Sequence, residues 1–219
     1  MSVATPFDPA CRRCPRLAGF LDRVARLHPD YFAAPIPSFG DPAAALLVVG
    51  LAPGMHGANR TGRPFTGDHA GLLLYQSLFD AGFGNQPDGL DPKDSLALHN
   101  YRITNAVRCL PPANKPLPEE VRCCNDFLLH ELTKAPAPRV ILALGQIAHQ
   151  AVLRAFQLRI KDYPFGHGTE HVLPSGQHLL DSYHCSRYNT QTRRLTPDMF
   201  AKVMEEARAL VEEDAALAP

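Results

Sequence analysis

The residues ALLVVGL at 45–51, followed by APGMHGANRTGRPFTGD at 52–68, decide the fold. The first seven are almost all aliphatic and include two adjacent valines, which is typical of a strand buried on both faces of a sheet. Five glycines fall between Gly50 and Gly67, and glycine lets a backbone approach a ligand closely. Neither G-x-x-x-x-G-K-[ST] nor G-x-G-x-x-G is present, which disfavours a nucleotide cradle of those kinds. We therefore predict a buried strand that leads into a ligand-binding loop of another kind.

Strands and helices alternate in the rest of the chain. Three further apolar runs predict buried strands at 101–107, 139–144 and 178–183. Helical patterns occupy 71–81, 118–132, 146–156 and 197–210. Connections of this length join parallel strands, so we predict a three-layer α/β/α sandwich with a central, mainly parallel four-stranded sheet. Ligands of such sheets bind beyond the carboxyl ends of the strands, which is where chemistry is expected.

Length and charge indicate one domain with two appendages. A chain of 219 residues suits a single domain over 1–219, with a proline-rich arm at 1–40 and an acidic C-terminal helix at 197–219. The 22 basic and 22 acidic residues balance, which excludes a polybasic coat as the basis of nucleic-acid binding. No apolar stretch is long enough to span a membrane. We expect a cytoplasmic protein, and nothing in the sequence demands a second subunit.

The cysteines form two clusters far apart in the sequence, with the six residues at Cys11, Cys14, Cys109, Cys123, Cys124 and Cys185. Such clusters favour metal ligation over a disulfide scaffold, and buried free thiols are the alternative. Four thiolates suit either zinc or an iron–sulfur cluster, and ligand type alone does not choose between them. In the helix predicted over 118–132, Cys124 shares the inward stripe with Val121 and Leu128, whereas Cys123 points about a quarter-turn away.

Three loops at predicted strand ends carry a family resemblance. The glycine-rich loop at 50–68, TNAVRCLPPANKP at 104–116 and HCSR at 184–187 together resemble the family 5 (type b) uracil-DNA glycosylases of bacteria and archaea. The resemblance extends from about Cys11 to Asn189. It implies a DNA repair enzyme that hydrolyses the N-glycosidic bond of uracil, and of hypoxanthine or other deaminated bases, to leave an abasic site. It also implies a nucleoid-associated protein whose [4Fe-4S] cluster is held by Cys11, Cys14, Cys109 and Cys124.

Asp68 is the expected catalytic carboxylate, because the reaction passes through a cationic sugar that a carboxylate can stabilise or supply with oriented water. Relatives of family 4 carry glutamate at the position of Leu51, so the acid must come from elsewhere in this chain. Capping of the helix at 71–81 is the alternative role for Asp68. The resemblance assigns Asn114 to water or sugar positioning, and His184 could donate to the anion that develops on the base.

The base itself must be flipped out of the duplex into a pocket. We expect Gly50, Leu51 and Ala52, where the backbone cradle begins, to bind this base. Phe65 could stack on it, and the Asn105 amide could read the adjacent C=O and N–H that uracil and hypoxanthine share. A core aromatic is the alternative role for Phe65.

The DNA strand around the flipped base needs contacts of its own. Arg187 and Asn189 lie in a segment that contains several basic residues and no acidic residue, so we predict that they contact DNA. The alternative is that they are solvated surface residues without a ligand. Arg63 could reach a phosphate by the same logic. No lysine lies at a matched catalytic position, which predicts no Schiff-base lyase step.

Two other functions remain as alternatives. One is a catalytically inactive iron–sulfur protein that binds nucleic acid with the same fold. The other is a zinc-dependent deaminase, but its H-x-E and P-C-x-x-C pattern is absent.

Overall fold

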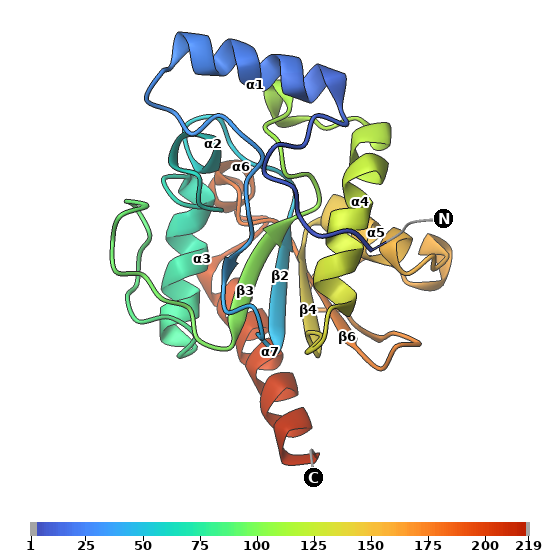
Figure 1. Cartoon of the computed structure of the whole chain (residues 1–219). Helices are drawn as coiled ribbons and strands as arrows, with labels where there is room; N and C mark the ends of the chain where they lie inside the picture. The colour runs from blue at the N-terminus through green and yellow to red at the C-terminus, as the bar shows by residue number, and fades with distance from the viewer. Residues whose placement is uncertain (1–3, 218–219) are drawn as a thin grey trace.

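Six strands form one mixed, mostly parallel sheet in the order β1-β3-β2-β4-β6-β5 (Figure 1). The computed structural model describes residues 4–217, and the side chains of residues 4–213. The strands are β1 (Phe39–Gly40), β2 (Leu46–Gly50), β3 (Tyr101–Asn105), β4 (Val140–Leu144), β5 (Glu170–Val172) and β6 (His178–Ser182). The four predicted strands are β2, β3, β4 and β6, which pair in parallel at the centre of the sheet.

The predicted number of strands is wrong, because the sheet has six strands and not four. β1 and β5 add antiparallel pairs at the two edges. β1 has two residues, and β5 carries the largely polar sequence Glu-His-Val with two exposed side chains. Neither strand contains the apolar run that marks a buried strand, so the pattern used to find the other four could not find these two.

Helices cover both faces of the sheet (Figure 1). The α-helices are α1 (Pro15–Leu27), α2 (Ala58–Thr61), α3 (His69–Asp80), α4 (Pro118–Thr133), α5 (Gln146–Ala155), α6 (Arg187–Gln191) and α7 (Pro197–Leu217). Two short 3₁₀ segments, η1 (Pro112–Asn114) and η2 (Ile160–Asp162), lie in loops. The predicted helices correspond to α3, α4, α5 and α7, with ends that differ by a few residues. α4 begins where expected because Pro118 occupies its first position and Glu120 accepts the Leu117 N–H at 2.7 Å.

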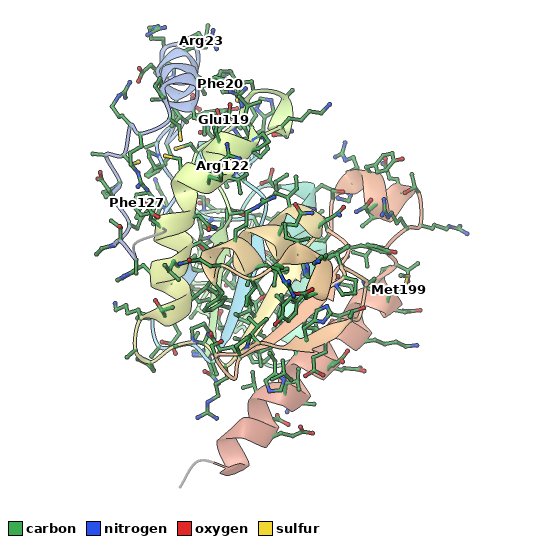
Figure 2. The ribbon with its side chains drawn as sticks, turned by 90° about the vertical axis from the view of Figure 1, so that its right-hand side faces the viewer. Phe20, Arg23, Glu119, Arg122, Phe127 and Met199 are labelled. Carbon is green, nitrogen blue, oxygen red and sulfur yellow. The ribbon has the colours of Figure 1, made fainter. Side chains whose placement is uncertain are left out.

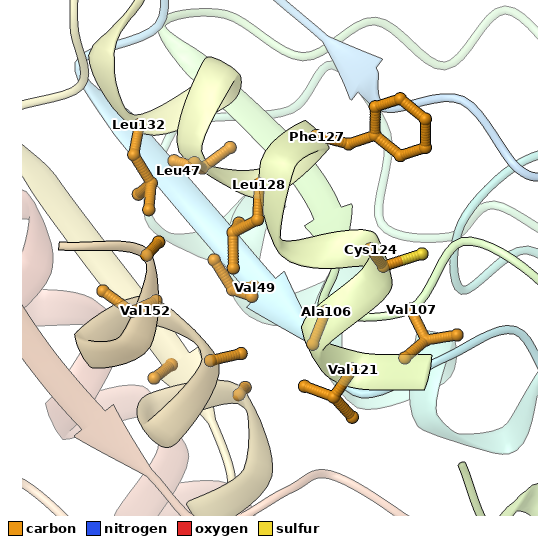
Figure 3. Packing of buried hydrophobic residues seen from close by; sticks show 14 of the residues in the cluster. Leu47, Val49, Ala106, Val107, Val121, Cys124, Phe127, Leu128, Leu132 and Val152 are labelled. Atoms are coloured by element: carbon orange, nitrogen blue, oxygen red, sulfur yellow. The ribbon is translucent and has the colours of Figure 1, made fainter. Parts of the chain in front are cut away.

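Alternate residues of the central strands enter two separate cores. Leu47 and Val49 of β2 face the core on the side of α4 and α5, and Figure 3 shows them among Leu128 of α4 and Val152 of α5. Leu46 and Val48 face the opposite way, toward α3 and α7. All four side chains are essentially inaccessible to solvent, which explains the continuous apolar run of this strand.

Helix α1 lies within the proline-rich arm and was not predicted. Leu17, Leu21 and Val24 form its buried stripe at helical spacing. An ion pair of 2.7 Å between Arg16 and Glu120 joins α1 to the start of α4, where Figure 2 shows Phe20 beside this end of α4. Among the described residues, none of the helices has the length and apolar character needed to cross a membrane.

Candidate active site

A cavity of about 830 Å³ opens at the edge where the parallel strands end. Nine of the residues predicted for the site line it: Leu51, Ala52, Phe65, Asp68, Asn105, Asn114, His184, Arg187 and Asn189. They come from three segments, which lie at or after the ends of β2, β3 and β6 and which the parallel sheet brings to one edge. The cavity therefore gathers the candidates for base binding, catalysis and DNA contact.

The Asp68 carboxylate lies against the glycine-rich backbone. A Cβ atom at Gly54 or Gly57 would overlap this carboxylate, so both positions require glycine in this arrangement. Asp68 immediately precedes α3, but its side chain makes no capping hydrogen bond to that helix. It accepts the Ala58 N–H at 3.3 Å instead. Asp68 therefore does not cap α3 through its side chain, and its carboxylate lines the cavity.

Burial raises the pKa of Asp68 above its ordinary value. The Ala58 N–H and the nearby charges of Arg60 and His56 oppose this shift without cancelling it. A carboxylate in such a setting is a strong acceptor, because little water screens it. It can orient a water molecule or stabilise a developing cation.

Asn105 and Phe65 form one side of the cavity above Gly50. Gly50 does not line the cavity; a Cβ atom there would overlap the Asn105 amide oxygen and reach within 2.9 Å of the Phe65 ring. The Asn105 side chain makes no hydrogen bond to any other part of the described chain and is 4 % exposed. Its donor and acceptor are thus available to a ligand in the cavity.

His184 lies on the other side of Phe65. The two rings are nearly parallel, with centroids 6.1 Å apart. Burial lowers the pKa of His184 to about 4, so the imidazole is neutral at pH 7. Its Nδ1 is buried and has no hydrogen-bond partner within the described residues. Phe65 has a φ of +59°, and Gly71 makes room for its carbonyl.

Asn114, Arg187 and Asn189 stand at the rim. Asn114 is exposed at the end of η1 with a φ of +56°, a conformation that asparagine tolerates better than most residues. Arg187 begins α6 and is exposed. The Asn189 amide donates to the His184 carbonyl at 2.8 Å, so in this structure it fixes the backbone of His184.

Arg63 lies outside the cavity, and its position does not support the expected phosphate contact. The side chain is buried and its guanidinium forms an ion pair with Asp94 at 2.7 Å. It also donates to the Asp91 carbonyl at 2.8 Å and to Thr66 at 2.6 Å. These bonds tie the loop before α3 to the segment before β3, which is a structural task.

Sequence reasoning missed one wall of the cavity. Phe165 and Tyr183 line this wall, with ring centroids 6.2 Å apart. The Arg194 guanidinium lies 4.7 Å from the centre of the Tyr183 ring. Tyr183 ends a predicted strand, which was a usable signal. Phe165 lies in an irregular loop whose sequence offered none.

All six cysteines are free thiols, and five of them lie close together between α1, α4 and the end of β3. Burial raises the pKa of Cys109 to about 12, and the neighbouring Cys124 and Cys11 add to the shift. Burial also raises the pKa of Cys14, and the contact of this thiol with Cys123 raises it further. Across residues 4–217, no three His, Cys, Asp or Glu side chains form a ready site for a single metal ion.

Comparison with known proteins adds evidence that is independent of this geometry. Residues 37–208 match the sequence model of the uracil DNA glycosylase superfamily. A type-5 uracil-DNA glycosylase of Thermus thermophilus is 52% identical over 206 residues, which is 92% of this chain and 94% of the relative. A type-5 uracil-DNA glycosylase of Pyrobaculum aerophilum is 41% identical over 91% of this chain and 88% of its own length. A type-4 uracil-DNA glycosylase of Archaeoglobus fulgidus is 36% identical over 56% of this chain.

Proposed function

The chain belongs to the uracil DNA glycosylase superfamily and within it to the type-5 uracil-DNA glycosylases, and from this premise we propose that it excises uracil from DNA. Water hydrolyses the N-glycosidic bond: its hydroxyl group bonds to C1′ of the deoxyribose and its proton goes to the base, so the products are free uracil and an abasic site. The single observation that carries the proposal is the half-buried Asp68 carboxylate in one cavity with Asn105, Phe65 and His184.

Each of these side chains has a chemical task in the proposed reaction. Asp68 orients water or stabilises the cationic sugar, and Asn114 at the rim positions the water or the sugar. Phe65 stacks on the flipped base, and Asn105 pairs with its adjacent C=O and N–H. Neutral His184 donates a hydrogen bond to the negative charge that leaves with the base.

DNA is held at the cavity mouth in this proposal. Arg187 is the first residue of α6, and its side chain is exposed at the rim of the cavity. In this position it contacts a phosphate next to the flipped nucleotide. Asn189 supports the same loop through the His184 carbonyl. We propose that the protein works as a monomer on chromosomal DNA in the cytoplasm.

A direct assay tests the proposal. A duplex with one uracil is incubated with the protein and heated in alkali, which cleaves the strand only at an abasic site. We expect scission at the uracil in wild type, and none with thymine at that position. The absence of scission would refute the proposal and leave the inactive nucleic-acid-binding protein as the better reading.

The proposal extends to a second substrate base and to the final product of the reaction. Hypoxanthine presents the same adjacent C=O and N–H as uracil, so an amide that reads only this edge accepts both bases. The protein has no lysine among the lining residues of the cavity, and we propose hydrolysis without a lyase step. A covalent adduct trapped by borohydride would contradict that part.

We also propose that Cys11, Cys14, Cys109 and Cys124 hold a [4Fe-4S] cluster. The donor set fits, because these thiols lie near one another, with Cys109 and Cys124 buried and Cys11 and Cys14 half-buried. Burial raises the pKa of the Cys124 thiol, and the hydrogen bond that it accepts from the Arg108 N–H opposes this shift without cancelling it. Bound there, the cluster would link the N-terminal arm to α4 and serve as a structural centre.

A further inference from the structure

A buried pair of titratable side chains lies behind the cavity wall. His149 is in the first turn of α5 and Asp181 is in β6, and neither side chain is accessible to solvent. The Nδ1 atom of His149 lies 2.8 Å from a carboxylate oxygen of Asp181. Its Nε2 atom lies 2.9 Å from the carbonyl oxygen of Tyr163. Both ring nitrogens therefore face oxygen atoms.

These contacts fix the number of protons. The Tyr163 carbonyl can only accept, so Nε2 must carry a hydrogen. The contact between Nδ1 and Asp181 then needs a second proton, either on the imidazole or on the carboxyl group. An imidazolium beside a carboxylate and a neutral imidazole beside a carboxylic acid have the same total charge. The pair is neutral in both cases, which suits its complete burial.

The pair anchors the loop that forms the missed wall. Asp181 accepts the Gly166 N–H at 3.4 Å through its side chain and the Gly168 N–H at 2.8 Å through its carbonyl. The Phe165 ring packs edge-on against His149, with centroids 5.6 Å apart. Phe165 and Gly166 line the cavity, whereas His149 and Asp181 do not.

We propose that His149 and Asp181 share one proton and act as positioning residues, which hold Phe165 in the wall that receives the DNA substrate. Burial raises the pKa of Asp181, in agreement with a retained proton, although the bond from His149 opposes the shift. His171 of β5 is the other titratable group beside the pair, with its ring centroid 6.0 Å from that of His149. The role in substrate positioning rests on the proposed glycosylase function; the shared proton does not.

Nitrogen-detected NMR of the imidazoles tests the shared proton in the wild-type protein at pH 7.5. We expect His149 Nε2 to carry a proton, with Nδ1 either protonated or hydrogen-bonded to a protonated Asp181. A His149 ring that is protonated at Nδ1 alone would overturn the assignment, because the pair would then be negatively charged. This outcome does not depend on catalysis.

Two substitutions at Asp181 test the positioning role. In Asp181→Asn, the amide can donate to a neutral imidazole and keep the geometry, so we expect single-turnover excision within about twofold of wild type. In Asp181→Ala, the backbone bond to Gly168 remains, but the carboxylate bonds to Gly166 and to His149 beneath Phe165 are lost. We expect the half-saturating DNA concentration to rise about tenfold while the maximal rate changes less than about threefold. The matched control is His178→Ala, which removes the partner of Glu170 in the same hairpin at 2.6 Å and should leave excision unchanged.

The outcomes separate the two claims. If wild type excises no uracil, the proposed function fails while the NMR result still decides the shared proton. Asp181→Ala with the kinetics of His178→Ala would overturn the positioning role. Asp181→Asn as impaired as Asp181→Ala would overturn positioning through hydrogen-bond geometry, since the charge of the carboxylate would then be required, and the NMR measurement alone decides the shared proton. If Asp181→Ala does not fold, Asp181→Asn and the NMR measurement remain decisive.

Discussion

At the scale of single residues, the site depends on where glycine makes room for a polar side chain. Gly54 and Gly57 admit the Asp68 carboxylate, and Gly50 admits the Asn105 amide. The identity of these polar residues could be predicted from the sequence, because each follows a recognisable strand or lies in a motif. The burial of these polar residues, and the fact that their hydrogen-bonding atoms are free, could not be predicted from the sequence. Both properties depend on the packing of distant segments.

Substitution of Asp68 by asparagine should separate activity from stability. We expect single-turnover excision of uracil to fall by about a hundredfold or more, because the charge that stabilises the cationic sugar is lost. We expect the free energy of unfolding at pH 7 to rise, because burial raises the pKa of this carboxyl group and its charged form is disfavoured in the folded state. Urea unfolding measures the second effect, with Asp80→Asn on the exposed end of α3 as control.

The same carboxylate predicts the acid limb of the pH profile. Excision requires ionised Asp68, so the rate should fall as the pH drops through a pKa that lies above the ordinary value of 3.8. A single-turnover series from pH 8 to pH 4 measures this limb. A rate that stays constant down to pH 4 would show that another group supplies the charge.

His184 predicts a pH dependence of stability. Its pKa is near 6.5 in the unfolded chain and about 4 in the folded protein. The unfolded state therefore binds more protons between these values, and stability is fully present above pH 6.5 and is lost as the pH falls toward 4, by up to about 3 kcal/mol. Denaturant unfolding of wild type and His184→Gln over this range should show a smaller loss in the variant; parallel curves would contradict the assignment.

At the scale of elements, the sequence predicted the parts of the fold that have a strong apolar pattern. The four central strands and the four long helices over the sheet carry such patterns and were found. The edge strands β1 and β5 are held by pairing with a longer neighbour, and α1 was hidden in a proline-rich arm. These elements owe their structure to contacts with the rest of the protein, which a local pattern does not encode.

Substitution of Arg63 and of Arg187 should have different effects, because Arg63 is buried between two loops and Arg187 is exposed at the start of α6. Arg63→Ala breaks a buried ion pair between loops, so we expect a loss of about 2 to 3 kcal/mol in the free energy of unfolding. Arg187→Ala removes an exposed charge at the rim, so stability should not change while DNA affinity falls and its salt dependence weakens by about one unit of slope. Urea unfolding and binding titrations at several salt concentrations measure these effects. An unchanged salt slope in Arg187→Ala would remove it from the DNA interface.

At the scale of the whole molecule, the cysteine cluster connects the N-terminal arm to the body. Arg16 and Glu120 already join α1 to α4 by an ion pair, and the thiols lie beside this junction. The arm packs along α4, with Arg16 on Glu120 and Phe7 on Phe127, and none of its described residues lines the cavity. Its contribution to function is therefore expected through the stability of the loop at 109–116, which contains Asn114.

Matched cysteine variants test the ligand set. We expect the protein purified under nitrogen to contain about four irons per chain and to absorb visible light, because four thiolates hold a cubane cluster. Cys124→Ser should lose most of the iron and unfold at a lower temperature, whereas Cys123→Ser should retain both. Zinc in place of iron, or equal losses in the two variants, would contradict the assignment.

The direction of α7 has a practical consequence. This helix begins beside the cavity at Pro197 and runs under the sheet to the opposite end of the molecule (Figure 1). A bead or resin tethered at its far end would therefore stand away from the cavity mouth, and long duplexes could reach the immobilised protein without meeting the support.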